Sequence, residues 1–206
     1  MYNLIEEICG YIEFLKKDYG LSITIHDKNS VLMRNKELLQ YNIHGGGYCL
    51  YLKSKKEIWD ECIHRQVKIY NRLEKERAPF YGACYMGVEE FVFPVFGEEK
   101  IVGFISVSCY RGRCDFKCAA ARFGLDSEEV KALYNKFLSA DVPPFDKVKT
   151  LIFPLSAMLS LYILTDADAA GTGTGEYIYA HALTYIKRNY GSKIYIEDIS
   201  RACHCS

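Results

Sequence analysis

The 206-residue chain carries no surplus of charge of either sign. Its 26 lysine and arginine residues balance 26 aspartate and glutamate residues, so the formal net charge is zero at pH 7. A protein that binds nucleic acid broadly needs a basic surplus on one face to neutralise phosphates. The balance therefore argues against broad nucleic-acid binding by this chain.

The sequence also lacks a basic leader and a long apolar run. Its first ten residues, MYNLIEEICG, place two glutamates inside an apolar stretch, which is unlike a signal peptide. The longest apolar run, Leu151–Leu164, is shorter than the about 20 residues of a transmembrane helix. We therefore expect a cytoplasmic protein with no membrane partner, whose nine cysteines are reduced thiols.

The common catalytic motifs are missing as well. There is no glycine-rich loop followed by Lys-Ser/Thr, no His-Glu-x-x-His zinc helix and no Gly-x-Ser-x-Gly elbow. His26, His44, His64 and His181 are scattered, and their spacing pairs none of them with a nucleophile. We expect these histidines to be surface or singly hydrogen-bonded residues, and we expect neither an enzyme nor a cofactor.

What the sequence does contain is a mixture of helical and strand patterns. Helical spacing of apolar residues covers 4–19, which ends at Gly20, and 55–77. Alternation predicts a strand over 21–27. The face of the 55–77 helix that we expect to be buried carries Ile58, Trp59, Cys62, Ile63, Val67, Tyr70 and Leu73.

Two neighbouring segments give weaker signals. VLMR (31–34) is compatible with a short strand. HGGGYCLYL (44–52) is expected to be irregular, because its three glycines permit unusual backbone angles.

The clearest strand signal is an antiparallel hairpin. VEEFVFPV (88–95) and IVGFISVSC (101–109) flank the four-residue loop GEEK. Strict alternation assigns one face of the second strand to the core, with Ile101, Gly103, Ile105, Val107 and Cys109. The other face carries Val102, Phe104, Ser106 and Ser108. Its mixture of aromatic and hydroxyl groups suits a half-polar ligand pocket or a partly solvated surface.

Helices return after the hairpin. Asp126 is placed to cap a helix, and Glu129 completes a capping-box pattern. An apolar helix over 146–164 must be buried or lie in an oligomer interface. Together these elements predict an α+β fold, in which an antiparallel sheet is flanked by helices.

Residues 1–165 resemble a PocR-type sensory domain, with the match covering 4–164. It rests on the order of YCLYL, the cysteine of the following helix, ACYMGVEEFVFPV, the hairpin, and ARFGLDSEEVKALYNKF. The resemblance implies a PAS-like domain that senses a simple small organic molecule such as a diol. The segment CYRGRCDFKC (109–118) departs from the bland segment expected at that place.

The end of the chain resembles a different family. Residues 166–176, DADAAGTGTGE, predict a small-residue linker. Residues 177–206 resemble the start of an AraC-type helix-turn-helix domain, through YIKRNY, a short helix IEDISRAC and Ser206 as an N-cap. In that family the next helix enters the major groove. The resemblance implies a truncated DNA-binding domain, so that DNA is a partner of the full-length protein and not of this fragment.

Aromatic and sulfur side chains gather around the pocket that the resemblance implies. The predicted ligand-binding residues are Tyr48, Cys49, Trp59, Cys62, Phe80, Cys84, Tyr85, Phe93, Phe104 and Ser106. Each aromatic alone fits a core better than a ligand contact, but together they suit a mostly apolar cavity with a few polar groups. We expect a small molecule there, not a nucleotide.

The cysteines leave other interpretations open. Cys49, Cys62 and Cys84 could pack as small hydrophobes or hold a metal, although their spacing is not that of a Cys-x-x-Cys knuckle. A second group, Cys109, Cys114 and Cys118, lies among cations that depress a thiol pKa, or forms a surface loop by coincidence. A metal-like trio, Cys203-His204-Cys205, falls inside the AraC-like segment.

The favoured function is the effector-sensing portion of an AraC-family bacterial transcription regulator. A small organic effector would bind the domain and shift its conformational population. The signal would pass through the 146–164 helix, whose apolar surface also predicts a homodimer. The alternatives are a thiol-redox or metal sensor, and an interaction module without a ligand.

Overall fold

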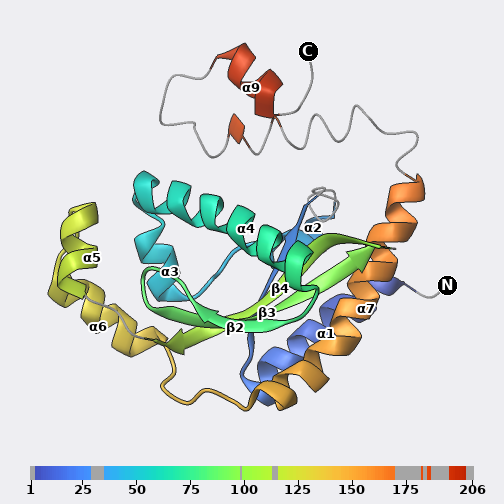
Figure 1. Cartoon of the computed structure of the whole chain (residues 1–206), viewed down its shortest axis with the longest axis horizontal. Coiled ribbons are helices and arrows are strands. Elements are labelled where there is room, and N and C mark those ends of the chain that lie inside the picture. The colour runs from blue at the N-terminus through green and yellow to red at the C-terminus, as the bar shows by residue number, and fades with distance from the viewer. Residues whose placement is uncertain are drawn as a thin grey trace.

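The protein is an α+β domain built on a four-stranded antiparallel sheet with helices around it, as predicted (Figure 1). The computed structural model describes residues 3–28, 35–97, 99–112 and 116–169, and also 182, 185–186 and 195–202. The predicted strand VLMR lies outside the described residues, as do most of the predicted linker and most of the AraC-like segment. In that segment, the expected short helix is present as α9 (Ile196–Ala202).

The sheet has the order β1-β4-β3-β2, and every neighbouring pair is antiparallel. Its strands are β1 (Ser22–Asp27), β2 (Phe80–Ala83), β3 (Val88–Gly97) and β4 (Lys100–Arg111). The β3–β4 pair is the predicted hairpin, and its pairing continues to Gly97 and Lys100, further into the loop than predicted. These two long strands form the centre of the domain.

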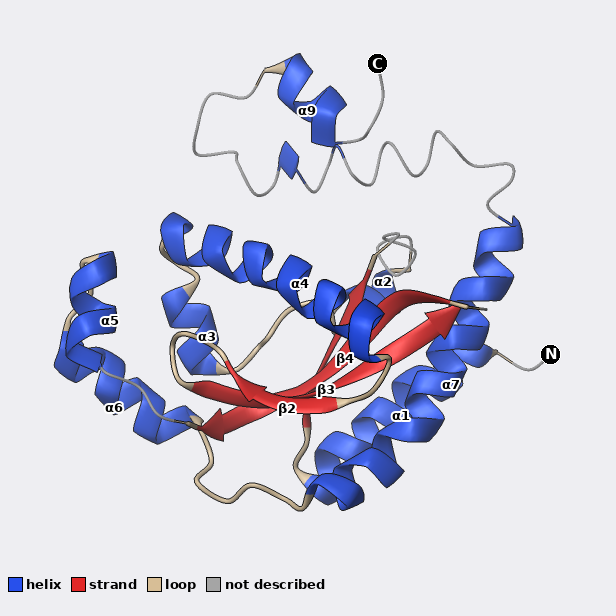
Figure 2. Cartoon of the chain, viewed as in Figure 1, coloured by secondary structure: helices blue, strands red, loops and turns tan. Residues whose placement is uncertain are grey.

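Helices cover both faces of this sheet (Figure 2). α1 (Leu4–Tyr19) and α7 (Phe145–Ala169) lie on one face, here called the α7 face. α4 (Lys56–Glu76) crosses the opposite face, here called the α4 face. The smaller helices are α2 (Lys36–Leu39), α3 (Gly47–Leu52), α5 (Phe116–Phe123) and α6 (Ser127–Phe137).

The main core lies between the α7 face and its two helices. Fully buried side chains at helical spacing come from both, namely Ile8, Ile12 and Leu15 of α1 and Val148, Ile152, Leu155 and Leu159 of α7. α1 ends as predicted at Gly20, whose φ of 65° is readily adopted by glycine. The α6 cap is also confirmed, because Asp126 accepts a hydrogen bond from the Glu129 backbone N–H.

Two irregularities in the β3–β4 pairing break the alternation assumed for β4. Near its start, Val95 pairs with Gly103 but Phe96 pairs with Ile101, which leaves Val102 as an extra, bulged residue. Ile101 therefore packs on the α4 face, and Val102 packs against the main core. The predicted faces of both residues were wrong, because a bulge reverses the side on which the preceding residues lie.

The second irregularity lies near the end of β4. Glu89 pairs with Tyr110, whereas Phe91 pairs with Val107. Cys109 sits in this stretch with a φ of 77°, and it packs away from the main core, against the cluster around α3 and α6. Its predicted place on the core face was therefore wrong for the same reason.

The segment 44–52 is more regular than predicted. Its last residues form α3, and Gly47 is the first residue of that helix. A Cβ atom at Gly47 would lie 2.5 Å from the Phe137 ring of α6. This glycine therefore permits close packing of α3 on α6, instead of producing an irregular backbone.

α7 is longer than predicted and begins at Phe145. By length and composition, Phe145–Thr165 could cross a membrane, so the prediction that this region is too short was wrong. In the structure one side of α7 belongs to the main core. On its outer side Phe153 is 73% exposed and Leu161 is 53% exposed.

The buried face of α4 is also narrower than predicted. Ile58 near its start and Leu73 near its end are fully buried, but Ile63 and Val67 are exposed. The middle of the helix faces a cavity, so its apolar residues do not all reach the sheet.

This orientation of α4 can be tested with a matched pair of alanine variants. Ile58→Ala should lower the free energy of unfolding by about 2 to 4 kcal/mol, because it removes buried methyl groups and leaves a void. Ile63→Ala should cost less than about 1 kcal/mol, because that side chain lies at the surface. Urea denaturation measures both, and equal losses would contradict the described orientation.

Candidate functional site

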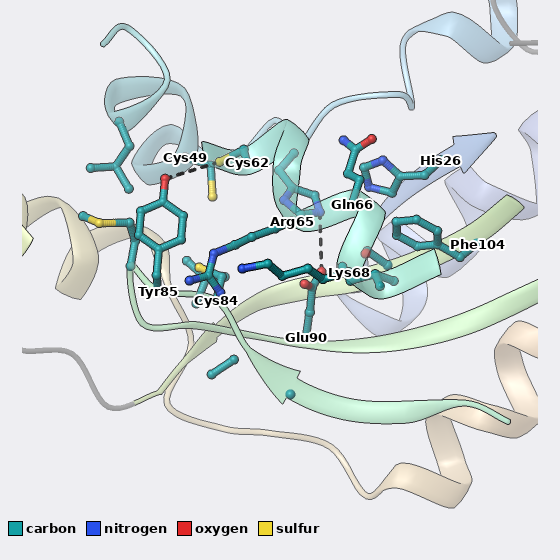
Figure 3. Close-up of a pocket in the computed structure, with 18 of the residues that line it drawn as sticks. His26, Cys49, Cys62, Arg65, Gln66, Lys68, Cys84, Tyr85, Glu90 and Phe104 are labelled. Carbon is teal, nitrogen blue, oxygen red and sulfur yellow. Dashed lines mark hydrogen bonds and ion pairs between the residues drawn. The ribbon is translucent and has the colours of Figure 1, made fainter. Parts of the chain in front are cut away.

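A cavity of about 330 Å³ lies between α4 and the α4 face of the sheet (Figure 3). Phe104 and Ser106 of β4 and Glu90 of β3 form its floor, and α4 covers it. α3 and the β2–β3 turn contribute the remaining walls, with Cys49 and Cys84. The volume is at the lower end of the range for small-molecule sites, which suits a small ligand and not a nucleotide.

Most of the predicted site residues meet at this cavity. It is lined by Cys49, Cys62, Phe80, Cys84, Tyr85, Phe104 and Ser106. These side chains come from α3, α4, β2, the β2–β3 turn and β4. Whether they contact a ligand stays a prediction.

The other three predicted residues do not line the cavity. Tyr48 is fully buried behind it and donates a hydrogen bond to the Met86 carbonyl at 3.0 Å. Trp59 lies beside Lys53, whose Nζ is 5.4 Å from its ring. Phe93 lies on the α7 face, in the main core, because its position in β3 alternates with the cavity-facing residues.

The sequence interpretation missed the polar side chains that line the cavity, apart from Ser106 and Tyr85. His26 of β1, His44 before α3 and Glu90 of β3 all reach it. His26 is only 7% exposed, and its ring stacks on Phe104 with centroids 4.4 Å apart. The expectation of a surface histidine was therefore wrong at this position. The feature that places His26 at the cavity is the β1–β4 pairing, in which His26 lies opposite Phe104.

Polar atoms without partners are concentrated at this site. Six buried side-chain atoms have no hydrogen-bond partner in the described part of the chain, namely Thr24 Oγ1, His26 Nδ1, His44 Nε2, Tyr70 OH, Glu90 Oε2 and Ser106 Oγ. Two of these atoms, His44 Nε2 and Glu90 Oε2, lie 3.6 Å apart, which is too long for a hydrogen bond (dashed line to Glu90 in Figure 3).

These atoms belong to one neighbourhood. Four of the six residues line the cavity itself. Thr24 pairs with Ser106 across the β1–β4 ladder, and the Tyr70 ring lies 5.0 Å from the Phe104 ring. A buried polar atom without a partner costs about 1 to 3 kcal/mol, so such a group calls for a bound molecule or water.

Burial controls the ionisation of the polar floor. It lowers the pKa of His44 to about 3 and holds the pKa of His26 well below its ordinary value. It raises the pKa of the Glu90 carboxyl, although the nearby Ser106 hydroxyl and the charge of Lys53 act in the opposite direction. Both imidazoles are therefore neutral at pH 7, and each can donate one hydrogen bond and accept another.

Two cysteines of the cavity, Cys49 and Cys84, have raised pKa values. Burial raises the pKa of Cys84 to about 11, and it raises the pKa of Cys49 as well. Cys62 Sγ lies 3.7 Å from the Tyr85 hydroxyl. A raised pKa suppresses the nucleophilic thiolate, so Cys49 and Cys84 suit a lining role better than a reactive one.

A metal site is not apparent in the described residues. No group of three or more His, Cys, Asp or Glu side chains among them is arranged to hold a metal ion. His181, Cys114, the side chain of Cys118 and the Cys203–Cys205 trio lie outside the part of the chain that can be assessed.

Comparison with known proteins identifies the domain. Residues 6–162 match the family model described as the sensory domain found in PocR. All cavity-lining residues fall within this match, whereas the AraC-like segment lies after it. Neither the curated proteins nor the solved structures gave a match.

The unpartnered state of the cavity floor can be tested by removing hydroxyls. Ser106→Ala should leave the free energy of unfolding of the ligand-free protein unchanged, or raise it by up to about 1 kcal/mol, because the lost hydroxyl has no partner. Ser156→Ala should lower it by about 1 kcal/mol, because Ser156 donates to the Pro94 carbonyl at 2.8 Å. Urea denaturation compares the two, and an equal loss in Ser106→Ala would show that its hydroxyl is already satisfied.

Proposed function

Because the chain belongs to the family of PocR sensory domains, we propose that it senses a small organic effector bound between α4 and the sheet. The family match gives a ligand-sensing role. The observation that supports this site is the concentration of unpartnered polar atoms around a cavity with apolar walls. Ligand sites combine these two features, since apolar walls supply affinity and a few polar groups fix orientation.

The walls favour a simple hydrocarbon derivative that bears oxygen-containing groups, of which a diol is one example. Phe80, Tyr85 and Phe104 offer ring surfaces for a carbon skeleton. His44 and Ser106 offer hydrogen bonds to its oxygens. A neutral imidazole can serve a hydroxyl as donor and as acceptor. We propose a binding role and not catalysis for these groups.

The proposed signal passes through β3 to α7. Glu90 reaches the cavity on one face of β3, while Phe91 and Phe93 pack in the main core on the other. α7 is hydrogen-bonded to the same strand, since the Ser156 hydroxyl donates to the Pro94 carbonyl at 2.8 Å. The cavity and α7 therefore share a strand, and an effector that prefers one position of β3 would bias the helix.

The proposed recipient of this signal is an AraC-type DNA-binding domain in the full-length bacterial regulator. The support is the sequence of 177–206, which follows α7 along the chain. In this proposal the protein acts in the cytoplasm, and α7 is a core helix and not a membrane span, because one side of it is buried against the sheet and α1. DNA recognition is proposed only for the longer protein.

We propose that the outer side of α7 forms a homodimer contact. Phe153 and Leu161 expose large apolar surfaces there. Leu161→Glu should weaken self-association at least about tenfold while preserving the fold, since it places a charge in an apolar contact without disturbing the core. Sedimentation equilibrium measures this, and a wild-type chain that stays monomeric at high concentration would contradict the dimer.

Effector binding can be tested by thermal unfolding with three alcohol–acid pairs. These are 1,2-propanediol and lactate, 3-methylbutanol and 3-methylbutanoate, and benzyl alcohol and benzoate. At least one compound should raise the melting temperature, because it binds the folded state only. Ser106→Leu should abolish that rise by filling the cavity, whereas Ser54→Leu, at an exposed position, should retain it.

Circular dichroism establishes that both leucine variants are folded. If no compound stabilises the wild-type chain, or if Ser106→Leu responds as the wild type does, the cavity is not the effector site.

A further inference from the structure

The cavity wall carries an imbalance of charge that the neutral chain as a whole does not show. Four cationic side chains line it, Lys53 after α3 and Arg65, Lys68 and Arg72 along α4, against the single carboxyl of Glu90. In Figure 3, Arg65 and Lys68 extend from α4 across the space above Cys84 and Glu90. The cations thus lie mainly on α4, which covers the cavity, and the carboxyl lies on the sheet that forms its floor.

The two arginines already have carboxylate partners. Arg65 Nε lies 3.3 Å from Glu61 Oε1, and Arg72 Nε lies 3.0 Å from Glu76 Oε2. Their guanidinium groups also stack on cavity rings, Arg65 over Tyr85 at 4.5 Å and Arg72 over Phe80 at 3.8 Å. They therefore hold the walls in place and are not free to neutralise an incoming anion alone.

The two lysines do not have such partners. Within the described part of the chain, no carboxylate lies within ion-pair distance of Lys53 or Lys68. The charge of Lys53 acts on the polar floor. It adds to the effect of burial in lowering the pKa values of His26 and His44, and it opposes the effect of burial, which raises the pKa of Glu90. Lys53 Nζ lies over the Trp59 ring, Lys68 is exposed, and no carboxylate of the described residues neutralises either ammonium group. Both charges can therefore attract an anion of matching size to the cavity.

We propose that the effector is a small carboxylic acid whose carboxylate pairs with Lys53 and Lys68 beneath α4. The carbon skeleton then lies against Phe104, and a hydroxyl group, where the acid has one, reaches the unpartnered atoms of the floor. This inference rests on the proposed sensing function and names the chemical class of its effector. The volume of about 330 Å³ restricts the acid to a small molecule.

Burial favours the neutral forms of the titratable groups on the floor. His26 and His44 are neutral at pH 7, because burial lowers the pKa of each. Burial also raises the pKa of Glu90, the one carboxyl on the wall, which disfavours a second negative charge beside the bound acid. In its protonated form Glu90 donates a hydrogen bond to an oxygen of the ligand.

Calorimetric titration of the three alcohol–acid pairs tests the class directly. Within at least one pair, the wild-type chain should bind the acid about tenfold more tightly than the alcohol, since hydrogen bonds to charged groups are worth about 1.5 to 3 kcal/mol. Raising the salt concentration should weaken binding of that acid, because ions screen a partly exposed pair. Binding of the matched alcohol should change little.

Lysine variants test whether the ligand carboxylate pairs with Lys53 and Lys68. Lys68→Met, at an exposed position that tolerates methionine, should weaken acid binding by about fivefold and leave alcohol binding unchanged. Lys53→Met should act in the same way. Lys75→Met is the matched control, because Lys75 lies on α4 outside the cavity, and it should bind the acid as the wild type does.

Each outcome decides between the two proposals. If an alcohol binds as well as its acid or better, the carboxylic-acid inference is overturned while the sensing function stands. If no compound of the three pairs binds, both are overturned. If an acid binds preferentially but Lys53→Met and Lys68→Met retain wild-type affinity, the assignment of its carboxylate to these lysines is overturned.

Discussion

The structure depends on an unmet requirement for hydrogen bonds on the α4 face of its sheet. Ser106, Glu90, His26 and His44 are held around one cavity, where each presents a buried polar atom with no partner in the described part of the chain. Folded proteins satisfy nearly all such atoms, because an orphaned one costs about as much as a lost hydrogen bond. Several such atoms in one place support the proposal that a polar molecule binds there. The rings around them then favour a molecule that also has a carbon skeleton.

The central strands make this arrangement possible. β3 and β4 present the polar floor to α4 on one side and the main apolar core to α1 and α7 on the other. The main core packs against the other face of these strands. α4 covers the cavity, and its fully buried residues, Ile58 and Leu73, lie near its two ends. In the proposed function, a ligand that contacts both the sheet and α4 would bias their relative position.

Local patterns were sufficient for much of the fold. The α1 helix with its stop at Gly20, the hairpin and the Asp126 cap are each encoded within a few residues, and all are present. The sequence also indicated most of the apolar cavity wall, through aromatic residues and cysteines in the order of a known family. Strict alternation misplaced Ile101 and Cys109, because nothing in the local pattern marks the bulges.

The polar floor could not be found in this way. His26 becomes a cavity residue only because β1 pairs with β4, which is some eighty positions away in the chain and puts the imidazole on Phe104. His44 and Glu90 likewise come together from an ordinary loop and an ordinary strand. Long-range pairing therefore determines which polar residues are buried, and single-sequence periodicity carries no information on it.

A crystal structure of the protein with the tightest-binding small acid or alcohol would test the central claim most directly. The ligand should lie between α4 and the sheet, with hydrogen bonds to at least two of His44, Glu90 and Ser106. A ligand bound elsewhere would contradict the claim. So would a closed cavity in which these same polar groups are paired with one another.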